Sequence, residues 1–227
     1  MLVKNWMSKP VVTISDDASM QDATALLKQH SIRMLPVLKK NKLVGVVTDR
    51  DLKKASASDA TSLEIHELLY LLMKIKVKQI MTRDPISVPV EWTVEETAEL
   101  LLRNKISGAP VVDEKESVVG VITQTDLFKV LISLTGIEIG GIQFAFKIKD
   151  QPGSIKEIAD IIRAYGGQMV SILSSYDKAP DGYRMVYIRM RNIDRPRLTS
   201  LQEALLQKAT LLYMVDQRQN QREFFDT

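Results

Sequence analysis

The chain has 227 residues, with 31 Lys and Arg against 28 Asp and Glu and a formal net charge of +3. Because charges of both signs are interspersed, no basic block of the kind that binds nucleic acid or a membrane surface is present. There is no cysteine and there are only two histidines, which excludes disulfides and thiolate metal sites and argues against a histidine metal cluster. With neither a signal-peptide pattern nor a membrane span to be recognised, we expect a cytoplasmic protein.

The first 130 residues contain one pattern twice. The segment 3–7 returns as 77–81, and 45–52 returns as 120–127, at a spacing of 74 residues that becomes 75 after the hairpin region. Each copy predicts a short strand, a capped amphipathic helix, a hairpin and a second helix. We therefore expect two similar domains, over 1–60 and 61–135, the second including a linker helix at 63–74.

A different pattern follows residue 136. Apolar residues alternate over 142–148, a helix begins after a Pro-Gly turn, two strands follow, and a second helix begins near Pro196. A final strand is expected at 210–215. The order β-α-β-β-α-β predicts a ferredoxin-like sandwich over 140–216, followed by a polar tail over 217–227. The fold class expected for the whole chain is α+β.

A Thr-x-x-Asp motif ends the hairpin of both copies, as Thr48 to Asp51 and as Thr123 to Asp126. The simplest interpretation is a capping box, and a single copy favours it. A helix start also attracts anions, so a threonine there can bind phosphate, and a carboxylate one turn on can accept both hydroxyls of a ribose. Because the motif is duplicated, the pattern favours a pair of nucleotide clefts.

These motifs, together with 32–37 and 106–111, resemble the tandem cystathionine-β-synthase (CBS) domain family over residues 1–135. That family packs two copies about a pseudo-twofold axis into a regulatory module that binds AMP, ADP, ATP or S-adenosylmethionine. The resemblance implies that the aspartates hold ribose, that the threonines approach phosphate, and that adenine is enclosed by backbone of the first strand and by the proline-containing strand. The candidate nucleotide-binding residues are Ile14, Arg33, Met34, Leu35, Pro36, Thr48, Arg50, Asp51, Val88, Ser107, Gly108, Ala109, Pro110, Thr123 and Asp126.

The two copies differ in charge near the motif. The first has Arg33 and Arg50, whereas the second has Ser107 and Thr125. Arginine can form two hydrogen bonds to a phosphate, which neutral residues cannot match in charge. We therefore expect the first cleft to prefer the more phosphorylated ligand.

Residues 140–216 resemble the ACT family of small amino-acid-sensing domains, on the segments 150–155 and 165–172. The resemblance implies an amino acid held at a subunit interface by Asp150, Pro152, Gly153, Ser154 and Gln168. Gln168 stands where the pattern usually has asparagine, and the alternative is an ordinary turn in a dimerisation module. The domain order resembles the acetoin-utilisation AcuB-like proteins over nearly the whole chain.

We therefore expect a non-catalytic sensor that binds an adenine nucleotide, with or without magnesium, and that acts as a homodimer on a target protein. The sequence contains no recognisable nucleophile and base, phosphate loop or calcium loop. The alternatives are a structural adaptor with empty clefts and a sensor of S-adenosylmethionine or an NAD-type ligand. Nucleic-acid binding is not expected, because the arginines over 184–197 are typical of a solvated edge.

Overall fold

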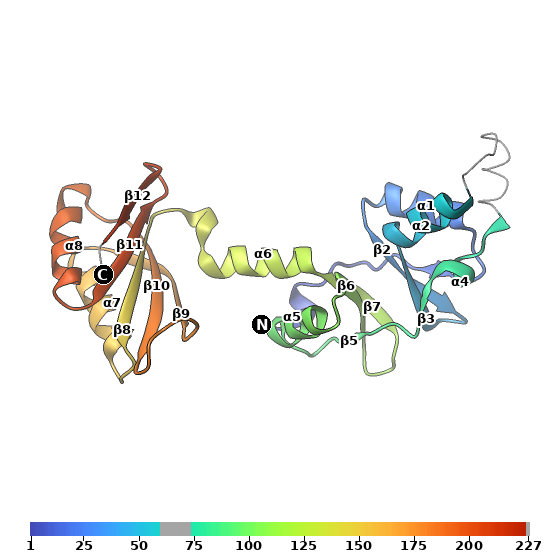
Figure 1. Cartoon of the computed structure of the whole chain (residues 1–227), viewed down its shortest axis with the longest axis horizontal. Coiled ribbons are helices and arrows are strands. Elements are labelled where there is room, and N and C mark those ends of the chain that lie inside the picture. The colour runs from blue at the N-terminus through green and yellow to red at the C-terminus, as the bar shows by residue number, and fades with distance from the viewer. Residues whose placement is uncertain (60–73, 226–227) are drawn as a thin grey trace. The chain divides into compact units, whose positions relative to one another are not determined.

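The computed structural model describes residues 1–59 and 74–225 and divides into two compact units, Met1–Phe128 and Lys129–Thr227 (Figure 1). Both units combine helices and strands, as the α+β prediction requires. Almost all of the linker helix expected at 63–74 lies outside the described residues.

The first unit contains both copies of the repeat up to Phe128, within the last helix of the second copy, and each copy builds its own small sheet. The first copy consists of η1 (Val3–Asn5), β1 (Ile14–Ser15), α1 (Met20–Gln29), β2 (Met34–Lys39), β3 (Lys42–Thr48) and α2 (Asp49–Asp59). The second consists of α4 (Val77–Ile80), β4 (Thr82–Arg83), β5 (Val88–Pro89), α5 (Val94–Arg103), β6 (Gly108–Val112), β7 (Val118–Thr123) and α6 (Gln124–Thr135). The sheet orders are β1-β2-β3-β4 and β5-β6-β7, so β4 joins the sheet of the other copy.

Capping boxes start the first long helix of each copy, as the sequence predicted. Asp22 N donates to Ser19 Oγ at 3.1 Å, while Asp22 Oδ2 accepts from Ser19 N at 2.9 Å. Thr93 and Glu96 repeat the arrangement at 3.2 and 2.8 Å. Hydrogen bonds from the Ser19 side chain and backbone hold the pKa of the Asp22 carboxyl below its usual value.

The buried face of α5 includes a polar residue. Thr97 is completely buried, whereas the apolar Leu102 is 78% exposed. Thr97 can take the core position because its hydroxyl donates to Thr93 O at 2.9 Å, which satisfies the polar atom inside the helix. The apolar stripe therefore follows Val94, Thr97 and Leu101.

Each copy of the repeat is completed by a segment from the other copy. Residues at the start of the first copy contact the second copy, and residues at the start of the second copy contact the first. Val3 N donates to Trp92 O at 2.8 Å and Val94 N donates to Met1 O at 2.8 Å, which ties residues 1–3 to the second copy. The equivalent bond in the first copy runs from Val77 N to Ala18 O at 2.9 Å. The repeated segments 3–7 and 77–81 are thus exchanged between the two sheets.

Two glycines accept the exchanged segments. A Cβ added to Gly120 would lie 2.5 Å from Met7 Sδ, and one added to Gly45 would lie 2.5 Å from Met81 Sδ. Any side chain at these positions would displace the methionine that crosses above the strand. The glycine of the repeated Gly-Val motif is therefore explained by close packing against the segment that comes from the other copy.

The second unit has one five-stranded sheet with the order β12-β11-β8-β10-β9. Figure 1 shows α7 and α8 against one face of this sheet. Val186, Ile188 and Met190 of β10 are completely buried in the core that these helices cover. The elements are η2 (Ile137–Ile139), β8 (Ile142–Lys149), α7 (Ser154–Ala164), β9 (Gln168–Ser175), β10 (Tyr183–Arg191), η3 (Arg195–Arg197), α8 (Leu198–Leu206), β11 (Thr210–Asp216) and β12 (Gln221–Phe224). The predicted β-α-β-β-α-β order is therefore confirmed for residues 142–216.

The polar tail predicted at 217–227 requires correction. Residues Gln221–Phe224 form β12, which pairs antiparallel with β11 and places Phe224 opposite Tyr213. No strand pattern is visible in these residues because an edge strand whose side chains face water needs no apolar alternation.

The start of the second unit is held against its sheet by a buried arginine. Arg189 is 5% exposed, and its Nε donates to Thr135 O at 2.8 Å. Its other nitrogens donate to Gln143 at 2.7 Å and Gln217 at 3.1 Å. Burial lowers the pKa of Arg189, but these three acceptors compensate the loss of water around the cation.

Candidate functional site

The first Thr-x-x-Asp motif lies at the junction between β3 and α2. Thr48 N and Oγ1 both donate to Asp51 Oδ2, at 2.9 and 2.7 Å, and Asp51 N donates to Thr48 Oγ1 at 3.3 Å. This is a complete capping box, so the simpler of the two interpretations left open by the sequence describes the local geometry.

The second motif has the same geometry at the junction between β7 and α6. Thr123 N and Oγ1 donate to Asp126 Oδ2 at 3.0 and 2.7 Å, and Asp126 N donates back to Thr123 Oγ1 at 3.4 Å. The duplicated sequence therefore builds one structure twice, with each carboxylate fixed in position at the start of its helix.

A capping role leaves room for a ligand at the first motif. A carboxylate offers about four acceptor positions, and the capping box uses two of them, both on Asp51 Oδ2. Within the described part of the chain, Asp51 Oδ1 accepts no hydrogen bond. The box thus orients the carboxylate without exhausting its capacity to accept hydroxyl groups.

Strand pairing brings the other candidate residues of the first copy to its motif. Met34 lies opposite Thr48 on the neighbouring strand, and Leu35 and Pro36 follow it along β2. Arg33 O accepts from Asp49 N at 3.1 Å, which fixes the residue before β2 against the start of α2. Parallel pairing places Ile14 opposite Val37 on the other side of β2.

The second copy assembles its candidates in the same way. Gly108 lies opposite Thr123, Ala109 and Pro110 follow it along β6, and Ser107 O accepts from Gln124 N at 2.9 Å. Val88 is paired with the same strand through Val111. The structure thus brings together the candidate residues within each copy.

The two arginines near the first motif have exposed side chains. Neither the Arg33 nor the Arg50 guanidinium makes a hydrogen bond or ion pair with another described residue. Both cations are therefore available to an anion in the first copy, whereas Ser107 is the exposed residue at the position of Arg33 in the second.

Two features of this region were missed by the sequence analysis. Met34 of the first copy reaches Gly108 of the second, since a Cβ added to Gly108 would lie 2.9 Å from Met34 Cε. Asp16, just after β1, is only 6% exposed, and its carboxylate lies 3.8 Å from Lys39 Nζ. In the sequence, these features are visible only as differences between the two copies. Met34 corresponds to Gly108, and Asp16 corresponds to Val90.

The candidate amino-acid site of the second unit is not assembled within one chain. Asp150, Pro152, Gly153 and Ser154 lie beyond the end of β8 at Lys149. Gln168 pairs with Arg191 of β10. The neighbouring residue of β10, Met190, pairs with Ile142 at the start of β8. The turn and Gln168 therefore occupy opposite ends of the sheet, and a site that uses all five residues requires two copies of the chain.

The turn itself carries a small polar cluster. Asp150 Oδ1 lies 3.4 Å from Arg184 Nε and accepts from Tyr176 Oη at 3.4 Å. Ser154 Oγ donates to Gln151 O at 2.9 Å and accepts from Arg184 at 3.4 Å. These contacts fix the Pro-Gly turn to β10 by pairing its polar atoms with one another.

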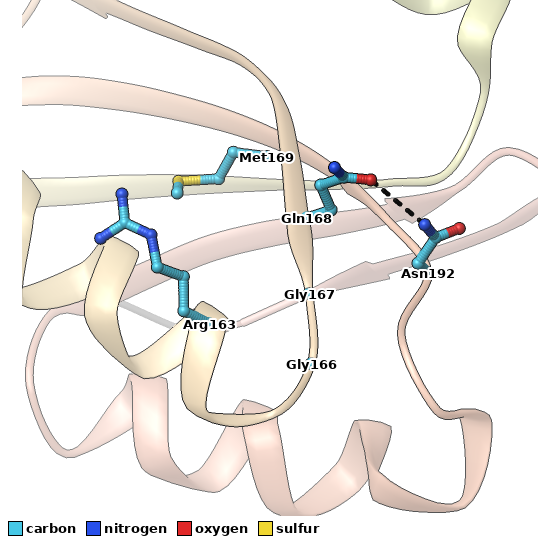
Figure 2. A pocket seen from close by; sticks show the side chains of 6 residues that line it. All are labelled: Arg163, Gly166, Gly167, Gln168, Met169 and Asn192. Atoms are coloured by element: carbon cyan, nitrogen blue, oxygen red, sulfur yellow. Dashed lines mark hydrogen bonds between the residues drawn. The ribbon is translucent and has the colours of Figure 1, made fainter.

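Gln168 borders an open hollow of about 500 Å³ at the other end of the sheet (Figure 2). Its lining consists of Arg163, Gly166, Gly167, Gln168, Met169 and Asn192. Gln168 Oε1 accepts from Asn192 Nδ2 at 3.2 Å and from Arg191 at 3.0 Å, while Arg163 pairs with Asp160 at 2.7 Å. Gln168, Asn192 and Arg163 thus each have a hydrogen-bond or ion-pair partner within the second unit.

Residues 1–59 and 74–225 contain no group of three or more His, Cys, Asp or Glu side chains that could hold a metal ion. In the same described ranges, none of the helices has the length and apolar character needed to cross a bilayer.

Comparison with known proteins agrees with this geometry. The CBS domain family matches residues 3–58 and 77–133. The CBS domain-containing protein DDB_G0289609 of Dictyostelium discoideum is 35% identical over 134 residues, which are 59% of this chain and 92% of that protein. The chain therefore belongs to the CBS-domain family and carries a CBS pair.

Solved structures show the same pair. The CBS domain pair of protein MJ0100, in complex with 5′-methylthioadenosine and S-adenosyl-L-methionine, is 32% identical with a TM-score of 0.50 and covers 58% of this chain and 95% of that one. A putative acetoin utilization protein (AcuB) from Vibrio cholerae is 27% identical with a TM-score of 0.51, covering 61% of this chain and 96% of that one. This match is shorter than the nearly complete similarity expected from the domain order.

The family match has two limits. The chain spans about a quarter of the length of some curated enzymes it resembles, such as 23% of the inosine-5′-monophosphate dehydrogenase of Korarchaeum cryptofilum, so only the CBS part is shared with them. The match also ends at residue 133, and membership of the second unit in the ACT family stays a prediction.

Proposed function

We propose that this protein is a regulatory sensor without catalytic activity, and that it binds an adenosine-containing ligand in two clefts, at Thr48–Asp51 and at Thr123–Asp126. The observation that carries the proposal is the duplicated, capped carboxylate at the start of a helix, in a chain 32% identical to a CBS pair solved with two adenosine compounds. The clefts would sense the ligand, and a target protein would respond.

The chemistry of the motif suits the adenosine moiety. A fixed carboxylate can accept the two neighbouring hydroxyls of a ribose, as an acidic residue does in dinucleotide-binding folds. The adjacent helix start offers a positive dipole end to a phosphate or carboxylate of the same ligand. We propose AMP, ADP or ATP as the ligand, with magnesium where ATP binds, and S-adenosylmethionine, 5′-methylthioadenosine or an NAD-type nucleotide as the alternative.

Replacement of either aspartate by asparagine tests the ribose contact. Asparagine retains an oxygen that can accept the capping hydrogen bonds, but it loses the charge that strengthens the bonds from the ribose hydroxyls. We expect Asp51→Asn and Asp126→Asn each to weaken binding at its own cleft by about 10- to 100-fold, the equivalent of one charge-assisted hydrogen bond. Calorimetry with AMP, ADP, ATP, 5′-methylthioadenosine, S-adenosylmethionine and NADH measures the change.

Asp22→Asn is the matched control, because Asp22 makes the same capping box with Ser19 at the start of α1 and belongs to neither set of candidate residues. It should leave the affinity unchanged. If no compound raises the melting temperature of the wild-type protein, the ligand-free adaptor is the better description, since any ligand of the native state stabilises it.

A second substitution tests the phosphate preference of the first cleft. We expect Arg33→Ala to weaken ATP binding about tenfold while changing AMP binding much less, because a guanidinium that pairs with a terminal phosphate interacts with ATP alone. Arg103→Ala, which removes another exposed arginine, from α5, should change neither affinity. Equal losses for AMP and ATP on Arg33→Ala would contradict the preference.

The proposal extends to a homodimer and to an amino acid as a second ligand of the ACT-like unit. The face of β10 opposite its buried core side carries Met185 and Tyr187, which are only half-buried. A site built from the Pro-Gly turn of one subunit and Gln168 of a second subunit would require a homodimer. Light scattering, with and without added amino acids, tests both parts.

A further inference from the structure

The two copies differ at one position that borders both motifs. Met34 and Gly108 are equivalent in the repeat, 74 residues apart, and each lies opposite the threonine of its own motif. Residues directly paired on antiparallel strands place their side chains on the same face of the sheet. A side chain at either position therefore projects beside the motif threonine.

The Met34 side chain occupies the place that Gly108 leaves vacant. A Cβ added to Gly108 would lie 2.9 Å from Met34 Cε and 3.0 Å from Thr123 Cγ2. The terminal methyl of Met34 and the methyl of Thr123 thus approach the same point from two sides. The Met34 backbone is paired with Thr48 in the first copy, and its side chain extends to the neighbourhood of Thr123 in the second.

The two motifs also differ in exposure. The Asp126 residue is only 3% exposed, whereas Asp51 is partly exposed. Met34 itself is 9% exposed, so most of its surface is packed against protein. The carboxylate of the second motif is therefore more buried than that of the first, and the Met34 methyl lies near the Thr123 methyl of the second motif.

We propose that Met34 shields the second cleft, so that an adenosine ligand occupies the first cleft before the second. This inference rests on the proposed function of the two motifs. A ligand that reaches Thr123 and Asp126 has to displace the Met34 methyl, which exposes buried apolar surface. Methionine suits this role because its unbranched chain can adopt other rotamers.

The shielding predicts unequal sites in the wild-type protein. Titration with 5′-methylthioadenosine, and with AMP as a second probe, should give a tight site and a site at least about tenfold weaker, because only the second requires buried methionine surface to be exposed. Met34→Gly gives both copies glycine at this position. We expect it to strengthen the weak site about tenfold or more, whatever its effect on the tight site, which Met34 also borders through Thr48.

Asparagine variants assign the sites. In the Met34→Gly background, Asp126→Asn should remove the gain in affinity and Asp51→Asn should retain it. Met20→Ala is the control for loss of a buried methionine, because Met20 is 2% exposed in the core of the same copy and forms part of neither motif. It should lower the melting temperature without changing the ratio of the two affinities.

Met34→Ala, which shortens the side chain without adding backbone freedom, repeats the test if the glycine variant does not fold. Two equal sites in the wild-type protein, or an affinity ratio that neither substitution changes, would overturn the shielding role while leaving the sensor function intact. Absence of binding in both the wild-type protein and the variants would instead overturn the proposed function, and the shielding role with it.

Discussion

Replacing Arg195 by methionine should lower the free energy of unfolding of the C-terminal unit by about 3–5 kcal/mol, because it leaves a buried carboxylate without its counter-ion. Asp216 is completely buried, and both of its oxygens accept from the Arg195 guanidinium. Asp216 also accepts hydrogen bonds from two backbone groups, Arg218 N at 3.0 Å and Gln219 N at 3.3 Å. Urea unfolding and hydrogen exchange of β11 and β12 measure the effect.

A double variant separates the lost charge from the lost packing. Arg195→Met combined with Asp216→Asn removes both charges, and much of the lost stability should return because no uncompensated ion is left in the interior. Arg163→Met removes an arginine that pairs with Asp160 at the surface, so it should change stability little. An effect of Arg195→Met no larger than that of the control would show that the Arg195–Asp216 pair does not hold this end of the sheet.

The Arg195–Asp216 pair illustrates which parts of the fold the sequence could not predict. Its members are 21 residues apart in the chain, and nothing in the pattern around either residue indicates the other. The strand β12 was missed as well. It follows a turn in which Arg218 N and Gln219 N donate to Asp216, and no local sequence pattern indicates these contacts. Helix starts such as Ser19–Asp22 were predictable because both partners lie within one helical turn.

The candidate site shows the same division between local and long-range information. The repeat predicted that both motifs start a helix after a strand, and strand pairing then brought Met34 opposite Thr48 as expected for a hairpin. The sequence could not decide between a capping box and a ribose contact, since both need the same residues at the same spacing. The contact of Met34 with Gly108 joins two copies and was visible only as a difference between them.

Introducing an aspartate at Val3 should destabilise the second copy of the repeat, although Val3 belongs to the first copy in sequence. Val3 is completely buried and its N–H donates to Trp92 O, just before α5. An unpaired carboxylate in this position loses its hydration without gaining a partner, which costs about 3 kcal/mol or more. Hydrogen exchange should become faster in α5, β6 and β7 than in β2 and β3.

Val77 offers the mirror experiment, because it is the repeat equivalent of Val3, is also completely buried, and donates from its N–H to Ala18 O, just before α1 of the first copy. Val77→Asp should accelerate exchange in α1, β2 and β3 first. Asn5→Asp adds the same charge at an exposed position of the same segment and should leave both copies protected. If each aspartate loosened the copy that contains it in sequence, the exchange of segments would be wrong. Each aspartate accelerates exchange in the opposite copy only if each sheet depends on a segment from the other copy. The two clefts would then belong to one cooperative unit.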